Sequence, residues 1–225
     1  MIPIPQYPLY TATLAYVSAT PIPYYLSEPD HWSLNHSVLV DAISKAKESN
    51  TPVKALVIIN PGNPTGACLS TEAMKQVVQL CYDEGIVLLA DEVYQANIFD
   101  PENRPFTSFK KVLRGMKKEV ADGVEMVSFH SISKGVSGEC GRRGGYFEAV
   151  NMSEEVMEQV YKMASVSLCP PVTGQVRDLR LLQPFAIAHR YISHRSASTS
   201  SSPHRNLATL PTPCTRKRPV RLKTT

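Results

Sequence analysis

The sequence predicts an α/β fold, in which a mostly parallel sheet is flanked by helices. Segments with the length and pattern of strands alternate with segments that have helical periodicity, which is typical of βαβ units. Several of the strand segments are continuous apolar runs, as expected for parallel strands that are covered on both faces. Some of these runs end abruptly in small polar residues and glycines, where parallel sheets carry their functional loops.

The expected elements follow from hydrophobic periodicity and from turn residues. Residues 7–26 alternate aromatic, aliphatic and β-branched residues between prolines, so we expect one or two short strands there. Helices are predicted for residues 36–48, 70–83, 109–118 and 154–164. Buried strands are predicted for residues 54–59, 86–90 and 124–129, and a further strand for residues 146–150.

Length and composition are those of one globular domain with a sizeable core. The 225 residues include no apolar run near the roughly 18 residues that a membrane helix needs, so no membrane partner is expected. The five cysteines are scattered and form no C-x-x-C pair. We therefore expect neither a disulfide framework nor a zinc site, and a reducing compartment.

The charge of the chain is divided unevenly along its length. Residues 176–225 contain ten basic residues and one acidic residue, a balance of +9, whereas the first 175 residues contain 14 and 19, a balance of −5. The basic segment is rich in serine and proline and keeps no hydrophobic period, which predicts disorder. We therefore divide the chain into a domain at residues 1–175 and a disordered tail at residues 176–225.

The most informative stretch is Ser131-Ile-Ser133-Lys134-Gly, which follows the predicted strand at residues 124–129. It places Lys134 just beyond the carboxyl end of a strand, with Arg142 eight residues later. An amine in this position suits Schiff-base formation, and serine hydroxyls and a guanidinium suit a phosphate group. The grouping suggests pyridoxal phosphate as the cofactor without establishing it.

Three loops should meet at one edge of the sheet, because each follows a predicted parallel strand. They contain Asn63, then Asp91 and Tyr94, and then the stretch that begins at Ser131. Each residue also has a purely structural interpretation: a turn for Asn63, a helix cap for Asp91, a core position for Tyr94, an ion pair with Glu139 for Arg142, and a solvated amine for Lys134. The coincidence of all five at matching strand ends favours a functional site.

The same motifs carry a resemblance to a known family. Asn-Pro-Thr-Gly at 63–66, Asp-x-x-Tyr at 91–94, and Ser-x-Ser-Lys at 131–134 with its following arginine are similar to fold type I pyridoxal-phosphate-dependent aminotransferases. Within that group, residues 1–8, 88–95 and 131–147 resemble the alanine aminotransferases. The resemblance extends from residue 1 to about residue 175.

The resemblance implies a role for each site residue. Lys134 would form the Schiff base with pyridoxal phosphate and would then act as the base that moves the substrate proton. Asp91 would pair with the pyridinium nitrogen, which keeps the ring an electron sink. Asn63 and Tyr94 would bind the 3′ oxygen of the cofactor. Its phosphate would be bound by Ser131, Ser133 and Arg142.

The resemblance also implies partners and limits. The substrates would be L-alanine and 2-oxoglutarate, an amino acid and a 2-oxo acid. The enzyme would be a homodimer in the cytoplasm or the mitochondrion. Such enzymes have a segment before the part that resembles this chain, and a carboxyl-terminal small domain with an arginine for the substrate carboxylate. We therefore expect a partial large domain, truncated at both ends, with little activity of its own.

Two other functions stay open from the sequence. One is a non-catalytic, regulatory product that pairs with full-length subunits. The other is an acyl hydrolase, because Ser131 and Lys134 also fit Ser-x-x-Lys, although the Lys-Thr-Gly partner motif is missing. Nucleic acid is not expected as a partner, despite the basic cluster at residues 216–221. The sequon at Asn151 is expected to be a chance match.

Overall fold

The structure is a computed structural model that describes residues 1–135, 139–167 and 171–175. The predicted disordered tail at residues 176–225, with its basic cluster, lies outside the described residues. Within the described part, no helix is both long enough and apolar enough to cross a membrane.

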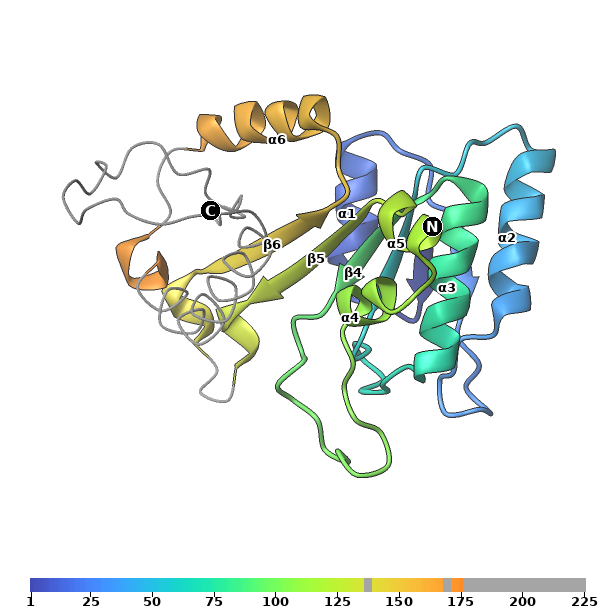
Figure 1. Ribbon diagram of the computed structural model, residues 1–225. Coiled ribbons are helices and arrows are strands. Elements are labelled where there is room, and N and C mark those ends of the chain that lie inside the picture. Colours follow the sequence, from blue (N-terminus) through green and yellow to red (C-terminus); the bar gives the residue numbers. More distant parts are fainter. Residues whose placement is uncertain (136–138, 168–170, 176–225) are drawn as a thin grey trace, which may run out of the picture.

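The centre of the fold is a four-stranded sheet with the order β3-β4-β5-β6 (Figure 1). Strands β3 (Ala55–Ile59), β4 (Val87–Asp91) and β5 (Met126–Ser131) are parallel neighbours. Strand β6 (Gly145–Val150) runs antiparallel to β5 at the edge. The predicted α/β class with a mostly parallel sheet is confirmed, and the carboxyl ends of β3, β4 and β5 lie along one edge.

Three helices lie where periodicity predicts them: α2 (His36–Glu48), α3 (Thr71–Glu84) and α6 (Glu154–Val166). Local signals set the ends of α3. The Ser70 side chain accepts a hydrogen bond from the Ala73 backbone N–H, and Gly85 ends the helix at a φ of 62°, which glycine adopts without steric cost. Helix α6 buries none of its residues in this chain.

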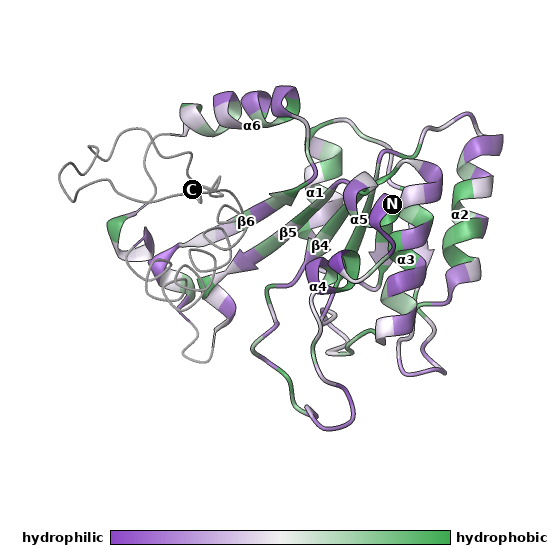
Figure 2. Ribbon diagram, viewed as in Figure 1, coloured by the Kyte–Doolittle hydropathy of each residue, from purple (hydrophilic) through white to green (hydrophobic). Residues whose placement is uncertain are grey.

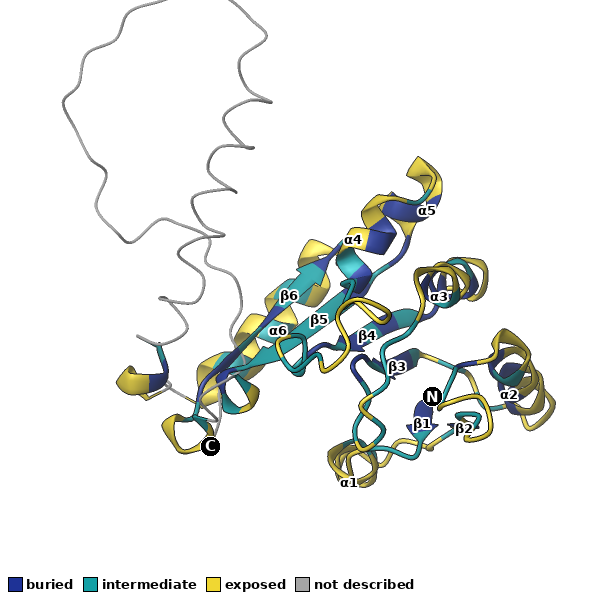
Figure 3. Cartoon of the chain, turned by 90° about the horizontal axis from the view of Figure 1, so that it is seen from below, coloured by how far each residue is buried: buried dark blue, intermediate teal, exposed yellow. Residues whose placement is uncertain are grey.

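The core lies between the sheet and the helices on one of its faces. Figure 2 shows apolar residues along the sheet and on the inner side of α3, and Figure 3 shows that these positions are buried while the outer sides of the helices are exposed. Fully buried side chains include Leu56, Met74, Leu88, Phe109 and Met126. This packing of apolar helix faces on parallel strands holds the strand ends in place.

The helix predicted at residues 109–118 is confirmed only over its first six residues. The structure has two short helices, α4 (Phe109–Arg114) and α5 (Lys118–Gly123). Gly115 caps α4, and Lys117, the N-cap of α5, has a non-helical ψ of 149°. Glycine has a low helix propensity, so the chain turns there although the apolar spacing continues.

The all-strand prediction for residues 7–26 is also wrong in part. Residues Leu9–Tyr16 form helix α1, and only β2 (Pro23–Tyr25) is a strand, paired in parallel with β1 (Ile2–Ile4). The apolar residues of α1 itself are spread over all sides of the helix, so the sequence shows no helical period there. Pro8 stands at its N-cap, next to the first helical residue. This small sheet is attached to β3, since the Tyr24 hydroxyl donates to the Val57 carbonyl at 2.7 Å.

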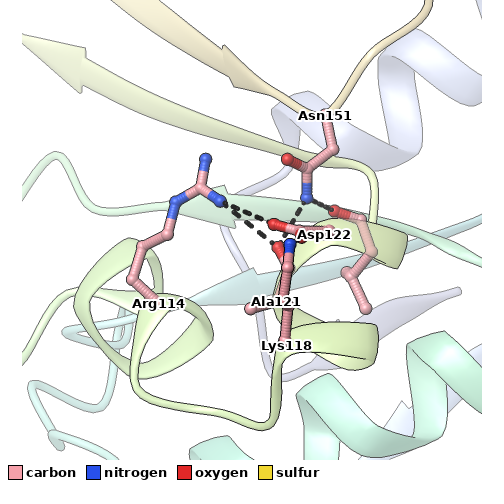
Figure 4. A network of polar contacts seen from close by, with 6 residues as sticks. Arg114, Lys118, Ala121, Asp122 and Asn151 are labelled. Carbon is pink, nitrogen blue, oxygen red and sulfur yellow. Dashed lines mark hydrogen bonds and ion pairs between the residues drawn. The ribbon is translucent and has the colours of Figure 1, made fainter. Parts of the chain in front are cut away.

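A polar network fastens α4 and α5 to the end of β6 (Figure 4). The Asn151 carboxamide donates to the carbonyl oxygens of Ala121 and Val124, each at 2.8 Å. Arg114 Nη1 lies 3.6 Å from Asp122 Oδ1, and Lys118 pairs with the same carboxylate. The side chain of Asn151 is therefore engaged in holding the backbone, which supports treating its sequon as a chance match.

Candidate functional site

The loops after β3, β4 and β5 are joined directly at the carboxyl edge of the sheet. The Asn60 backbone N–H donates to the Asp91 carbonyl at 2.9 Å, and the Glu92 N–H donates to the Phe129 carbonyl at 3.2 Å. These bonds continue the ladder of the sheet into the loops. The polar residues that follow the three strands therefore gather in one region, as the parallel order requires.

Asn63, Tyr94 and Lys134 form one cluster in this region. The Asn63 side-chain amide donates to the Tyr94 hydroxyl at 3.1 Å. The Lys134 ammonium nitrogen lies 5.6 Å from the centroid of the Tyr94 ring, within the range of a cation–π contact. The three loops thus bring together an amide, a phenol and an amine, of which the amine is exposed.

Asp91 ends strand β4 and is held by two donors. The Tyr10 hydroxyl donates to its Oδ2 at 2.6 Å, and the Val93 N–H donates to its Oδ1 at 3.3 Å. Burial raises the pKa of Asp91, while these two hydrogen bonds lower it. Burial, reinforced by the carboxylate, also raises the pKa of the Tyr10 phenol well above its usual range, so that Tyr10 is a fixed donor.

Tyr10 is a site residue that the sequence prediction missed. It lies on α1, which the sequence assigned to strands, and 81 residues separate it from Asp91. The sequence signal was the Tyr7-Pro-Leu-Tyr10 run at the start of α1. No local pattern shows which side chain Tyr10 contacts.

Ser131 caps the short 3₁₀ turn η1 (Ile132–Lys134) that presents the lysine. Its hydroxyl group accepts a hydrogen bond from the Ser133 N–H at 3.1 Å and donates one to the Gly144 carbonyl at 3.4 Å. Gly144 is closely approached here, because a Cβ atom at this position would lie 2.8 Å from the Ile132 side chain. The Ser131–Lys134 turn is therefore packed against the chain that enters β6.

Arg142 lies in a second 3₁₀ turn, η2 (Cys140–Arg142), and its side chain is 59% exposed. Its Nε lies 3.9 Å from Glu139 Oε1, a long ion pair between an exposed arginine and a half-buried glutamate. Within residues 1–135, 139–167 and 171–175, no hydrogen bond or ion pair joins Arg142 to Ser131 or Lys134. The ion pair with Glu139, one of the structural interpretations, is thus present in this structure.

Glu92, next to Asp91, has a structural role that its sequence position does not reveal. It is 4% exposed, and its two carboxylate oxygens accept from the Phe109 N–H and the Ser128 hydroxyl, each at 2.7 Å. Burial raises the pKa of Glu92, and these two hydrogen bonds oppose the shift. The carboxylate thereby joins the start of α4 to β5 beneath the site.

Replacing Glu92 tests this structural role. We expect Glu92→Leu to lower the free energy of unfolding by about 1–3 kcal/mol, because the buried Phe109 N–H and the half-buried Ser128 hydroxyl lose their acceptor. Glu92→Gln is the matched control, since its amide can accept from Phe109 and donate to the Ser128 oxygen. Urea unfolding, followed by circular dichroism, measures both; equal losses in the two variants would contradict the expectation.

The pH dependence of the same variants gives an independent check. A carboxyl group whose pKa is raised by folding favours the folded state below its ordinary pKa, and this contribution is lost as pH rises through the raised pKa. Glu92→Gln should therefore show a smaller fall in the free energy of unfolding over that interval than the parent chain shows.

Comparisons with known proteins identify the family. A sequence model of aminotransferase class I and II matches residues 1–183. The chain belongs to the aminotransferase class I and II family. This membership accounts for the parallel sheet and for the polar residues at its carboxyl edge.

Relatives and solved structures agree with this assignment. The chain is 49% identical over 176 residues to glutamate–glyoxylate aminotransferase 1 of Arabidopsis thaliana, covering 78% of this chain and 36% of that protein. It is 50% identical over 187 residues to a probable mitochondrial alanine aminotransferase of Dictyostelium discoideum, covering 83% and 35%. An alanine aminotransferase structure from Pyrococcus furiosus matches with a TM-score of 0.65 and 26% identity, covering 85% of this chain and 45% of that one.

The chain is much shorter than these aminotransferases. It spans about a third of the length of the curated relatives that it matches. The family and the fold apply to the part of these relatives that the chain matches.

Proposed function

We propose that this chain binds pyridoxal phosphate at the carboxyl edge of β3, β4 and β5 and supplies the cofactor-binding part of an aminotransferase site. One observation carries the proposal: the Lys134 amine lies over the Tyr94 ring beside Asn63, at the strand edge that also ends in the half-buried Asp91. An amine, a phenol–amide pair and a half-buried carboxylate match the groups that this cofactor requires.

Different residues of the chain would bind different parts of the cofactor. Pyridoxal phosphate, when bound, supplies an aldehyde and an electron-accepting ring. The Lys134 amine is the group that would join the aldehyde, and the same amine would accept and return the substrate proton. The phosphate would be held by hydroxyl and guanidinium donors, from Ser131, Ser133 and Arg142.

Asp91 and the Asn63–Tyr94 pair would orient the ring. Burial makes the charged form of Asp91 costly, and a protonated ring nitrogen beside it would offset that cost. The Tyr10 hydroxyl fixes the direction of the carboxylate by its bond to Oδ2. The Tyr94 hydroxyl, positioned by Asn63, is the donor available for the 3′ oxygen of the ring.

The whole reaction would be the transfer of an amino group between an amino acid and a 2-oxo acid. Relatives named as alanine and glutamate–glyoxylate aminotransferases support L-alanine with 2-oxoglutarate as the substrate pair. We propose that the whole enzyme is a homodimer in the cytoplasm or the mitochondrion. The Dictyostelium relative is named as mitochondrial. We propose residues 1–175 as the cofactor-binding domain and residues 176–225 as a separate tail.

The proposal is tested by chemical trapping in the purified 225-residue chain. Pyridoxal phosphate is added, the mixture is reduced with borohydride, and the modified lysine is located by mass spectrometry. We expect a single pyridoxyl group on Lys134. A label spread over several exposed lysines, or no label, would overturn the cofactor site and leave only the shared ancestry.

Tyr10 offers a more specific test of the same site. Tyr10→Phe removes the donor to Asp91 and keeps the ring, so we expect pyridoxal phosphate to bind about tenfold more weakly, the value of one hydrogen bond to a charged group. Tyr16→Phe on the same helix is the control, since Tyr16 is 89% exposed. Absorbance titration with the cofactor measures both; equal dissociation constants for the two variants would contradict the role of Tyr10.

A further inference from the structure

The pairing of β4 with β5 ends before the chain reaches Tyr94 and Lys134. The strand register stops at Asp91 opposite Phe129, and one further backbone bond follows it, from the Glu92 N–H to the Phe129 carbonyl. Tyr94 and Lys134 both lie beyond this point, on two separate loops. Side-chain contacts are therefore needed to hold the Lys134 amine at its 5.6 Å from the centroid of the Tyr94 ring.

A hydrogen bond between Gln95 and His130 joins the two loops. Gln95 Nε2 lies 2.8 Å from His130 Nδ1. Gln95 directly follows Tyr94, and His130 directly precedes Ser131, which caps the turn that carries Lys134. The bond thus connects the chain neighbours of two candidate site residues that lie on different loops.

The chemistry of this bond defines the form of the His130 ring. A carboxamide nitrogen only donates hydrogen bonds, so Nδ1 accepts from Gln95, and the neutral ring carries its proton on Nε2. Burial lowers the pKa of His130, while a hydrogen bond with the Glu92 backbone raises it in part. The neutral ring, which is the form that can accept from Gln95, is therefore favoured at neutral pH.

His130 is in turn held by the edge strand β6. It lies opposite Tyr146 in the β5–β6 register, and the two ring centroids are 5.1 Å apart in a tilted aromatic contact. Gln95 therefore bonds to an acceptor that the sheet keeps in place, and the loop after β4 gains an attachment next to Tyr94. Gln95 and His130 are both half-buried, so we expect the fold to survive the loss of this bond.

We propose that Gln95 and His130 are positioning residues, whose hydrogen bond holds the Tyr94 phenol and the Lys134 amine at the separation at which both reach pyridoxal phosphate. Neither residue is assigned a contact with the cofactor. They act through their chain neighbours, Tyr94 on one loop and the Ser131–Lys134 turn on the other. The inference rests on the proposed function, because Tyr94 and Lys134 are assigned to the cofactor there.

Four single variants separate the hydrogen bond from the bulk of the two side chains. Gln95→Met and His130→Leu each remove the bond, whereas His130→Asn keeps an acceptor oxygen close to the position of Nδ1. Gln79→Met is the matched control, because Gln79 Nε2 donates to Asp83 Oδ1 at the same 2.8 Å on α3, outside the three loops. Circular dichroism of each variant checks that the fold is retained.

Attachment of pyridoxal phosphate is the first measurement, made with the cofactor at a concentration below its dissociation constant. We expect the yield of the pyridoxyl label on Lys134 to fall about fivefold in Gln95→Met and in His130→Leu, the value of one neutral hydrogen bond. His130→Asn and Gln79→Met should stay within about twofold of the parent chain. The double variant Gln95→Met/His130→Leu should lose no more than either single variant, because the pair acts as one unit.

The position of the amine is measured separately, in the isotopically labelled chain without cofactor. The nuclear Overhauser effect between the Lys134 side chain and the Tyr94 ring should weaken in Gln95→Met and in His130→Leu. It should persist in His130→Asn and in Gln79→Met. This measurement follows the placement of Lys134 itself, which a general loss of stability in a folded variant would not change.

The outcomes separate the positioning pair from the cofactor site. A nuclear Overhauser effect that is unchanged in Gln95→Met and in His130→Leu would overturn the positioning role, and so would equal loss of the label in His130→Leu and His130→Asn. A parent chain that acquires no label on Lys134 overturns the cofactor site. The nuclear Overhauser effect then still decides whether the pair holds Lys134 against Tyr94.

Discussion

Lys134→Arg is expected to abolish the pyridoxyl label that borohydride fixes in the parent chain. A guanidinium keeps the positive charge over the Tyr94 ring but remains protonated and cannot join the aldehyde. The reversible contacts that we propose for Asp91, Asn63 and Ser131 would be unchanged, so we expect pyridoxal phosphate still to bind reversibly. Intact-mass measurement after reduction, together with an absorbance titration, separates attachment from binding.

Lys45→Arg is the matched control for this result. Lys45 is exposed on α2, outside the loops that follow β3, β4 and β5, and should carry no label in the parent protein. The control variant should therefore be labelled at Lys134 like the parent. A variant without Lys134 that still acquires one stoichiometric label would show that another lysine forms the attachment.

Phe109→Ala is expected to have the largest effect on stability. Phe109 is fully buried, and truncating a buried phenylalanine costs about 3–5 kcal/mol through lost apolar burial and the cavity that remains. That is a large fraction of the roughly 5–15 kcal/mol that stabilises an ordinary domain. We expect the midpoint of urea unfolding, measured by circular dichroism, to fall sharply, and the loop between β4 and α4 to lose its anchor.

Phe99→Ala makes the same chemical change in the loop that precedes α4. Phe99 is 92% exposed, so its truncation should change the free energy of unfolding by no more than about 0.5 kcal/mol. Similar losses in Phe99→Ala and Phe109→Ala would mean that α4 does not pack on the sheet as the structure has it.

The elements with strong periodic patterns were predictable because their local and tertiary preferences agree. Helix α2 has apolar residues at helical spacing, and those residues are the ones that are buried. Helix α3 has in addition a serine that caps it and a glycine that ends it. Where no period existed, as in α1, or where a glycine interrupted one, as between α4 and α5, the prediction was wrong.

The candidate site divides in the same way. The positions of Asn63, Asp91 and Lys134 at one edge of the sheet were predictable, because each lies at or after the end of a strand and parallel strands place their carboxyl ends together. Their roles stay predictions. Tyr10 and Glu92 were missed as partners, since the contacts of each depend on how loops and helices far apart in sequence pack together.

The sequence by itself determined the fold class, the family and the strand-end position of Lys134, because periodicity and motif spacing are local properties of the chain. Only the tertiary structure decided that α1 brings Tyr10 to Asp91 and that Glu92 joins α4 to β5. The physical reason is that burial and hydrogen-bond partners arise from contacts between distant segments, which no local pattern contains.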